Sequence, residues 1–283
     1  MESAFERSAG QEALIADWNP PVIDTSKPHS ARIYDYLLGG KTNFAPDREA
    51  AEQTLAAVPH ASIAARANRA FLLRAVDHLA RTGVRQFLDI GTGIPIEGRN
   101  THDAAQAVAP ESRVVYVDND PIVLAHARAL LSSHADGATA YIDADARDPE
   151  AILAHSALSE TLDLDQPLAV LMLAVLHFFP DDDKPADVLQ RLTDRLPAGS
   201  HLVLSHLTGD FDPVTTGGGV TVYRKSGIPM QVRSRTELAA LLPDGWEPLE
   251  PGVELVSHWR AEDGADLPDP SEIGCYGLVA RKL

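Results

Sequence analysis

The chain has 283 residues, 45% hydrophobic and 23% charged, which supplies a sizeable core and excludes long disorder, and its formal net charge of −17 argues against a nucleic-acid partner. The single cysteine, Cys275, excludes an internal disulfide and a thiolate metal cluster. No apolar run reaches the roughly 18 residues of a membrane span, so we expect a cytoplasmic protein.

The N-terminal part combines an irregular start with helical patterns. Residues 1–30 are rich in Pro, Ser and Thr, which predicts an irregular arm. Helical spacing follows at residues 31–38, ended by Gly39 and Gly40, and again at 47–57 and 63–81. For the last helix the spacing predicts an apolar face of Ile63, Ala67, Phe71 (or Ala70), Arg74 and Val76.

From residue 83 onward short apolar runs alternate with helical segments. The predicted strands are residues 86–90, 113–117, 138–142, 168–173 and 201–205, and the predicted helices are residues 101–109, 121–132, 149–158 and 184–196. Such alternation is typical of parallel strands joined by right-handed crossovers. We therefore predict a doubly wound α/β core.

The C-terminal part departs from this alternation. Residues 215–219, which include three consecutive glycines, predict a mobile loop, and a β-branched run follows at 220–223. A helix is predicted at 235–242. Strands at 254–259 and 276–281 enclose an acidic turn, so they predict an antiparallel hairpin at the sheet edge.

A glycine pair follows the first predicted core strand directly. Gly91, Thr92 and Gly93 let the backbone turn sharply and approach a ligand without Cβ clashes. In an open α/β sheet, ligands bind beyond the carboxyl ends of the strands. A dinucleotide fingerprint needs a third glycine where this chain has Ile96, so a tightly held pyrophosphate is disfavoured.

Acidic residues end the next two strands. Asp118 lies 25 residues beyond Gly93, where a carboxylate can accept hydrogen bonds from both hydroxyls of a ribose. The alternative is that Asp118 or Asn119 only caps the helix that begins at Pro121; we assign capping to Asn119 or Asp120 and the ligand to Asp118.

Two further strand ends offer candidate ligand contacts. After the third strand, the carboxylate of Asp145 and the backbone N–H of Ala146 could bind an adenine edge, with Asp143 as the competing acid and Asp148 as a helix cap. After the fourth strand, His177 could orient an acceptor or remove its proton. A packed structural histidine is the alternative.

These features together resemble the Rossmann-like S-adenosylmethionine-dependent methyltransferases over residues 86–210. The chain also resembles, more narrowly, an actinobacterial family of uncharacterised methyltransferases formerly classed as a domain of unknown function. Its distinctive strings are residues 30–44, 66–72, 100–102, 174–179 and 223–234. The resemblance implies a mostly parallel seven-stranded sheet with a C-terminal antiparallel hairpin, and S-adenosylmethionine as cofactor.

The resemblance also suggests roles for the N-terminal segment. Residues 1–82 are expected to form a lid over the cofactor and residues 83–283 the methyltransferase core. Tyr34, Tyr36 and Asn43 lie on the lid, and we include Tyr36 and Asn43, with Asn119, among the candidate cofactor contacts. Ordinary packing is the alternative for the tyrosines.

The resulting functional hypothesis is a methyltransferase that acts on a small-molecule acceptor, with no metal ion. Methyl transfer from a sulfonium needs alignment and exclusion of water more than acid–base chemistry. Two alternatives remain from the residues alone: a non-catalytic regulator that binds S-adenosylmethionine, and a nicotinamide-dependent oxidoreductase.

Overall fold

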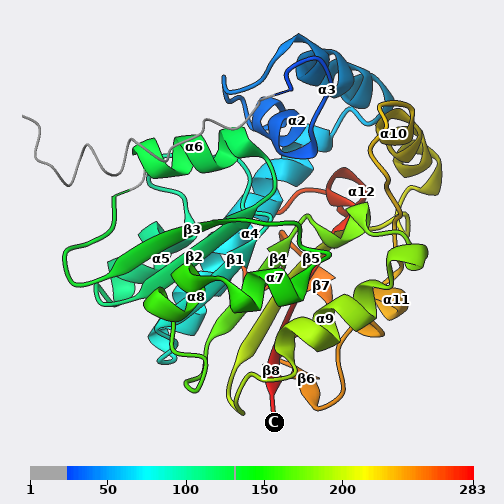
Figure 1. Cartoon of the computed structure of the whole chain (residues 1–283). Helices are drawn as coiled ribbons and strands as arrows, with labels where there is room; N and C mark the ends of the chain where they lie inside the picture. Colours follow the sequence, from blue (N-terminus) through cyan, green and yellow to red (C-terminus); the bar gives the residue numbers. More distant parts are fainter. Residues whose placement is uncertain (1–23, 131) are drawn as a thin grey trace, which may run out of the picture.

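Helices and parallel strands alternate along most of the chain, after three helices at its start. The computed structural model describes residues 24–130 and 132–283 (Figure 1). Residues 1–23 of the predicted arm therefore lie outside the described residues. None of the helices in the described part is long and apolar enough to cross a membrane.

The strands and helices predicted between residues 86 and 205 occur in the predicted order. The helices are α2 (Ser30–Leu37), α3 (Ala45–Ala57), α4 (Ala61–Arg81), α5 (Thr101–Val108), α6 (Pro121–Leu130), α7 (Pro149–Ala154), α8 (Ser156–Thr161), α9 (Pro185–Thr193), α10 (Pro213–Lys225), α11 (Arg235–Ala239) and α12 (Pro270–Ile273), with short 3-10 turns η1 (Leu176–Phe178) and η2 (Asp181–Asp183). The strands are β1 (Gln86–Ile90), β2 (Arg113–Asp118), β3 (Ala138–Asp143), β4 (Ala169–Leu173), β5 (His201–Leu207), β6 (Trp246–Pro248), β7 (Glu254–Leu255) and β8 (Cys275–Lys282).

The strands form one mixed sheet in the order β3-β2-β1-β4-β5-β8-β6, with β7 also paired to β8. Strands β1 to β5 are parallel, whereas β8 runs antiparallel to β5, β6 and β7. The predicted α/β fold, with its mostly parallel seven-strand order and antiparallel C-terminal strands, is confirmed. The first strand of the predicted hairpin is shorter than expected, because only Glu254–Leu255 pairs with β8.

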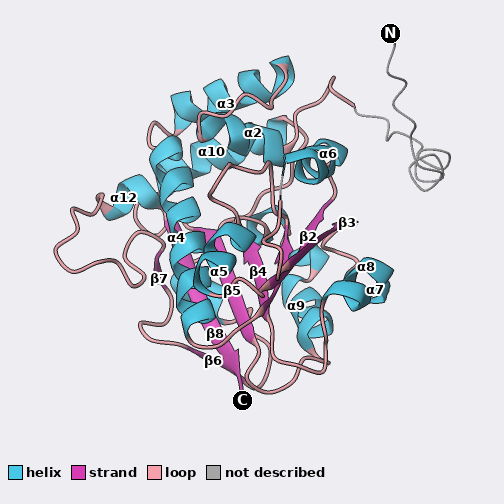
Figure 2. Ribbon diagram, turned by 90° about the vertical axis from the view of Figure 1, so that its left-hand side faces the viewer, coloured by secondary structure: helices cyan, strands magenta, loops and turns pink. Residues whose placement is uncertain are grey.

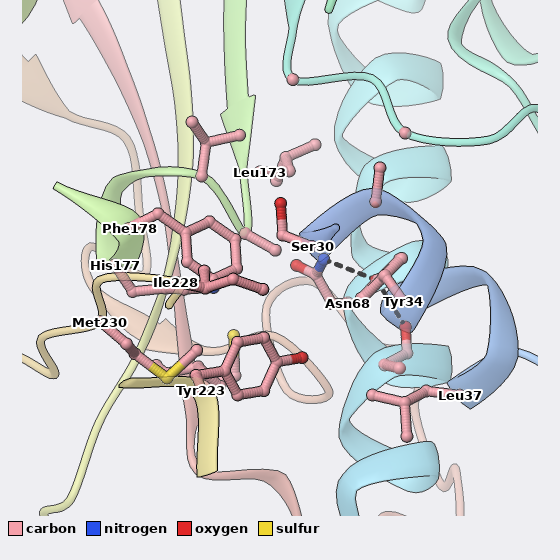
Figure 3. A pocket seen from close by; sticks show the side chains of 18 of the residues that line it. Ser30, Tyr34, Leu37, Asn68, Leu173, His177, Phe178, Tyr223, Ile228 and Met230 are labelled. Atoms are coloured by element: carbon pink, nitrogen blue, oxygen red, sulfur yellow. Dashed lines mark hydrogen bonds between the residues drawn. The ribbon is translucent and has the colours of Figure 1, made fainter. Parts of the chain in front are cut away.

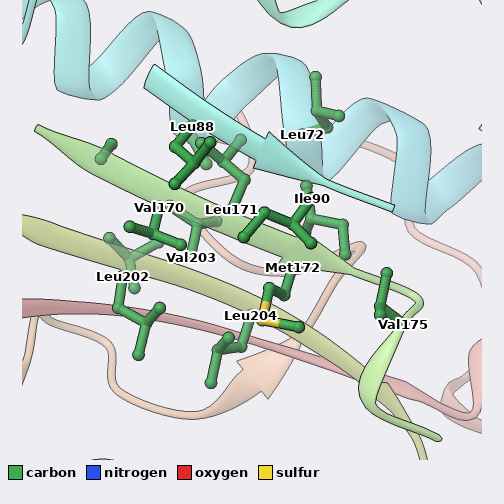
Figure 4. Packing of buried hydrophobic residues seen from close by; sticks show 14 of the residues in the cluster. Leu72, Leu88, Ile90, Val170, Leu171, Met172, Val175, Leu202, Val203 and Leu204 are labelled. Carbon is green, nitrogen blue, oxygen red and sulfur yellow. The ribbon is translucent and has the colours of Figure 1, made fainter. Parts of the chain in front are cut away.

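Helices cover both faces of this sheet, with α4 and α5 on one side and α7, α8 and α9 on the other (Figure 2). Every residue of β1 and β4 is buried for that reason. Figure 4 shows Leu88 and Ile90 of β1, Val170 and Met172 of β4 and Leu204 of β5 in this core.

Two predicted helices differ from those in the structure. The buried stripe of α4 contains Ala65, Asn68, Phe71, Leu72, Ala75, Val76 and Leu79, so the predicted face was rotated and shares only Phe71 and Val76 with it. Arg74 instead lies at the edge of this stripe and donates to the carbonyl oxygens of Val256 and Trp259. The helix predicted at 149–158 is two helices, because His155 accepts from the N–H of Ala157 and begins a new one.

The glycine-rich segment predicted as a mobile loop, together with the β-branched run after it, is helix α10. Asp212 caps the helix by accepting from the N–H of Thr215, and Pro213 occupies its first position. A Cβ at Gly219 would lie 2.8 Å from Cγ2 of Val58, and one at Gly218 3.5 Å from Cβ of Ala57. The glycines therefore permit close packing of α10 against the end of α3.

The N-terminal helices lie beyond the carboxyl ends of the parallel strands (Figure 1). A buried ion-pair cluster attaches them to the sheet: Nε of Arg32 in α2 donates to Oδ2 of Asp120 at 2.9 Å, and Nη1 lies 3.6 Å from Oδ2 of Asp47 in α3. Asp47 and Asp120 are 0% and 2% exposed. Backbone N–H groups also donate to both carboxylates, those of His29 and Phe44 to Asp47 and that of Ile122 to Asp120, and Nδ1 of His29 lies 3.2 Å from Oδ2 of Asp120. The guanidinium supplies the permanent positive charge of this buried cluster.

Replacing Arg32 tests the importance of the cluster. Arg32→Met should lower the free energy of unfolding by about 3–5 kcal/mol, because it leaves two buried carboxylates without their cation. Denaturant unfolding followed by circular dichroism measures this change. The control is Arg81→Met, which breaks an exposed pair with Asp77 at 2.8 Å and should have a much smaller effect. Equal losses in the two variants would contradict this account of the cluster.

Candidate functional site

A cavity of about 460 Å³ lies at the carboxyl ends of β1, β2 and β4. The strand order reverses between β1 and β4, and an open α/β sheet binds ligands at such a point. Helices α2, α4 and α10 contribute the opposite wall. The cavity thus joins the predicted glycine loop to the N-terminal helices.

The glycine loop lines this cavity and has the backbone conformation that glycine favours. Gly91 and Gly93 have φ of 72° and 67°, in the left-handed region. The N–H of Gly91 donates to the carbonyl oxygen of Val117 at 2.8 Å, and the N–H of Gly93 donates to Oδ2 of Asp118 at 2.9 Å. Thr92 lies between them and also lines the cavity. The loop is therefore fastened to the end of β2.

The end of β2 places Asp118 and Asn119 in the cavity wall. The Oδ1 atom of Asp118 accepts from the N–H of Asp120 at 2.9 Å, and burial raises the pKa of its carboxyl. Asp120 takes the capping role, because its Oδ1 accepts from the N–H of Ile122 at 3.0 Å. A carboxylate has about four acceptor positions, so Asp118 retains capacity for two more hydrogen bonds.

The end of β3 contributes Asp145 and Ala146 to the same cavity. Oδ1 of Asp145 accepts from the backbone N–H of Arg147 at 2.8 Å and lies 3.3 Å from its Nη1. Asp143, the competing acid, is exposed and does not line the cavity. Asp148 caps α7 by accepting from the N–H of Ala151, as predicted.

His177 lines the cavity from the 3-10 turn that follows β4, and it is 3% exposed. Its Nδ1 is buried without a hydrogen-bond partner. Burial, with the neighbouring His206 and Arg233, holds the pKa of His177 well below its usual value. The imidazole is therefore neutral at pH 7.

Buried Arg233 holds this turn in place. Its guanidinium donates to the carbonyl oxygens of Leu176 and Phe179 at 3.3 and 3.0 Å and to Oδ1 of Asp181 at 2.6 Å. It also lies 3.0 Å from Nε2 of His206. Because Leu176 and Phe179 flank His177, Arg233 fixes the position of that histidine.

Two charged residues near the loop were missed by the sequence interpretation. Asp89, at the end of β1, is buried and accepts from Oγ1 of Thr101 at 2.5 Å; burial raises its pKa to about 6. Arg69 of α4 donates from Nη2 to Oδ1 of Asn100 at 2.9 Å, while its Nε is buried without a partner. Both line the cavity.

The other side of the cavity is an apolar chamber. Figure 3 shows Phe178, Tyr223, Ile228 and Met230 on one side of it and Tyr34, Leu37 and Asn68 on the other. Several of these residues belong to a second hydrophobic cluster, separate from the core of the sheet. The N-terminal helices and α10 therefore build a compartment that the sheet alone lacks.

Tyr36 and Asn43 are not among the residues that line the cavity. The hydroxyl of Tyr36 donates to Oε1 of Glu52 at 3.2 Å, near the surface. Asn43 donates from Nδ2 to Oδ2 of Asp35 at 2.8 Å and to the carbonyl oxygen of Gly40 at 3.1 Å. Asn43 therefore fixes the turn after α2, and Tyr36 connects α2 to α3. Among residues 24–130 and 132–283 no group of three or more His, Cys, Asp or Glu is placed to hold a metal ion.

The missed residues left partial signals in the sequence. Asn68 and Arg69 lie in the distinctive string 66–72, and Arg233 lies in the string 223–234. No spacing rule assigns a role to these strings. Asp89 was visible as an acid within an otherwise apolar strand, which is a mark of a buried functional group.

Comparison with known proteins agrees with this geometry. A sequence profile described as S-adenosyl methyltransferase matches residues 16–283. A DUF574 family protein of Streptomyces avermitilis is 45% identical with a TM-score of 0.89, covering 92% of this chain and 99% of its own. A predicted methyltransferase of Thermobifida fusca is 37% identical with a TM-score of 0.85, covering 94% and 99%. The comparison with curated proteins gives no significant match.

A more distant structure shares the fold alone. The plantazolicin methyltransferase BpumL is 11% identical, with a TM-score of 0.53 over 89% of this chain and 96% of its own. The predicted fold and family are thus confirmed.

The two loop glycines differ in a testable way. Alanine at either position should cost about 1–2 kcal/mol of stability through the left-handed φ. A Cβ at Gly91 would also lie 2.2 Å from Cγ2 of Val175, whereas one at Gly93 meets nothing within 4 Å. Gly91→Ala should therefore reduce the free energy of unfolding more than Gly93→Ala, and adding Val175→Ala should reduce the difference. Denaturant unfolding measures all three, and equal losses for the two glycine variants would contradict the clash.

Proposed function

Because this chain belongs to the S-adenosyl methyltransferase family, we propose that it transfers the methyl group of S-adenosylmethionine to a small-molecule acceptor. One observation carries the proposal: a single cavity of about 460 Å³ joins the glycine loop and Asp118 to an apolar chamber. Family membership favours methyl transfer over nicotinamide-dependent oxidation. The net charge of −17 supports a small acceptor over a nucleic acid.

The residues at the end of β2 fit the ribose of the cofactor. Asp118 would accept from the two ribose hydroxyls, because one backbone N–H on each carboxylate oxygen leaves further acceptor capacity. Open space beside Gly93 admits a ligand close to the backbone. Asn119, Asp145 and the N–H of Ala146 line the same wall and would contact the adenosine.

Arg69 and Asp89 fit the methionine end, which carries a carboxylate and an ammonium. The partnerless Nε of Arg69 is a donor for a carboxylate, and the buried Asp89 is an acceptor for an ammonium. Thr92 lines the same cavity and would contact the cofactor beside the glycines. Arg69 and Asp89 would thus each face a cofactor group of opposite charge.

The chamber and His177 would serve the acceptor. S-adenosylmethionine, when bound, supplies a methyl group on a positively charged sulfur. The chain's contribution is to align the acceptor and exclude water, which the walls from α2, α4 and α10 support. Neutral His177 would accept a hydrogen bond from the acceptor; its low pKa suits orientation better than storage of a proton.

Replacing Asp118 tests the ribose contact. Asp118→Ala should weaken binding of S-adenosylmethionine by about 1.5–3 kcal/mol, because charge-assisted hydrogen bonds are lost. Isothermal titration calorimetry measures it. Asp143 is the matched control, since it lies opposite Asp118 in the register of β2 and β3 but outside the cavity wall, so Asp143→Ala should bind normally. Well-folded wild-type protein that fails to bind the cofactor at millimolar concentration would refute the proposed function.

The pH dependence of binding tests Asp89. Its carboxyl, with a pKa raised to about 6, is ionised above that pH, so cofactor affinity should rise between pH 5 and 7.5 as an ammonium gains its partner. The free energy of unfolding should change in the opposite direction. The folded protein holds the Asp89 proton more tightly than the unfolded chain does, so this contribution to stability is fully present below about pH 4 and is lost as the pH rises through 6.

The control for this pH dependence is Asp89→Asn. Its affinity at pH 7.5 should fall toward that of the wild type at pH 5 and remain flat between them. Calorimetry at several pH values measures both proteins. An unchanged pH profile in the variant would assign the titration to another group, such as Asp118.

A further inference from the structure

We propose that the apolar chamber selects an uncharged, flat apolar acceptor whose O–H or N–H group donates a hydrogen bond to the amide oxygen of Asn68. This inference rests on the proposed function, because it names the acceptor class of the same site. Asn68 is then a residue that determines specificity.

The orientation of the Asn68 amide follows from its neighbours. The carbonyl oxygen of Ala65 can only accept, so the hydroxyl of Tyr34, at 3.0 Å, must donate to it. The Tyr34 oxygen is then an acceptor for Nδ2 of Asn68, also at 3.0 Å. The amide nitrogen is thereby directed to Tyr34. In Figure 3 the amide oxygen points to the opposite side, toward Phe178.

That amide oxygen has no partner within the protein. Oδ1 of Asn68 is buried and accepts no hydrogen bond, and the residue is 6% exposed. Asn68 also interrupts the apolar stripe of α4 between Ala65 and Phe71. A buried polar atom without a partner is costly, so its presence in a cavity wall indicates a ligand that satisfies it.

The groups around Asn68 favour an uncharged ligand. Apart from Arg69 and the alanines, serine and glycine, the cavity-lining residues of α2, α3, α4 and α10 that the structure describes are uncharged: Tyr34, Leu37, Thr54, Asn68, Leu72, Thr215, Thr216, Val220 and Tyr223. Arg69 donates to Asn100, and its charge partly opposes the rise that burial causes in the pKa of Asp89, which places Arg69 toward the glycine loop. The two acids that line the cavity here already have partners. Asp212 accepts the N-cap hydrogen bond from the N–H of Thr215, and Oε1 of Glu272 lies 3.5 Å from Nδ1 of His60. An ionised acceptor would therefore lose hydration without gaining a partner.

Aromatic walls favour a flat ligand. The ring centroids of Phe178 and Tyr223 are 5.8 Å apart, and those of Phe178 and His177 are 4.3 Å apart. Nδ1 of His177 is a second buried atom without a partner. At neutral pH it is an acceptor or donor without charge, so it adds no preference for an ion. The chamber thus offers aromatic faces and one oriented acceptor.

Three probes of one shape test the proposal with the full chain. These are 1-naphthol, which donates an O–H; its methyl ether, which cannot donate; and 1-naphthoate, which is an anion. Calorimetric titration in the presence of saturating S-adenosylhomocysteine should show naphthol binding about tenfold more tightly than the ether. Naphthoate should bind least tightly.

The variant Asn68→Leu keeps the size of the side chain and removes the acceptor. Naphthol affinity should fall about tenfold to that of the ether, while the ether binds as before or more tightly. The matched control is Thr54→Val, another buried cavity residue, whose hydroxyl already donates to the carbonyl oxygen of Ala50 at 2.8 Å. Thr54→Val should keep the preference for naphthol.

The outcomes separate this inference from the proposed function. Lack of S-adenosylhomocysteine binding would refute the proposed function and, with it, the acceptor assignment. Normal cofactor-product binding with equal affinity for naphthol and ether, or tighter binding of naphthoate, would overturn the inference alone. Failure of all three probes at millimolar concentration would do the same. The comparison of probes on the wild type needs no variant, so it remains decisive if Asn68→Leu does not fold.

Discussion

The end of strand β2 is the point on which the site depends, because it carries two acids with separate tasks. Asp118 binds the N–H of Gly93 and so fastens the glycine loop, while Asp120, two residues on, binds Arg32 of the N-terminal helices. Burial makes both arrangements costly to break. The short segment 118–120 therefore aligns the glycine loop after β1 with the N-terminal helices, and residues from each of these three parts line the cavity.

Close helix packing completes the compartment. The glycines of α10 let that helix approach the end of α3, which brings Tyr223 opposite Tyr34 and Asn68 across the chamber. On the sheet side, Arg233 binds the carbonyl oxygens on either side of His177. The apolar chamber is thus enclosed by packed helices and by a turn that Arg233 holds in place, an arrangement suited to the proposed alignment of a methyl acceptor. Its polar atoms without protein partners are the groups that a bound molecule can satisfy.

Much of the fold was predictable because the spacing of apolar residues along the chain indicates which residues are buried. Short, mainly apolar runs predicted β1 and β4, and acids after strands predicted Asp118 and Asp145, which line the cavity. Local patterns failed where distant packing decides the outcome. The glycines of α10 indicated a loop because the pattern does not show Val58 beside Gly219. Arg74 was placed on the buried face of α4, although the edge of that stripe lets it reach the carbonyl oxygens near Trp259.

By itself, the sequence determined the alternation of strands and helices between residues 86 and 205, the sheet class, the glycine loop and the acids that follow it, because each depends on neighbours along the chain. Only the tertiary structure decided which polar groups meet. It placed Arg69, Asp89 and Asn68 in one cavity and placed Tyr36 and Asn43 outside its wall. The physical reason is that hydrogen-bond partners such as Tyr34 and Asn68 are 34 residues apart, and whether a buried polar atom is satisfied depends on contacts that no local pattern contains.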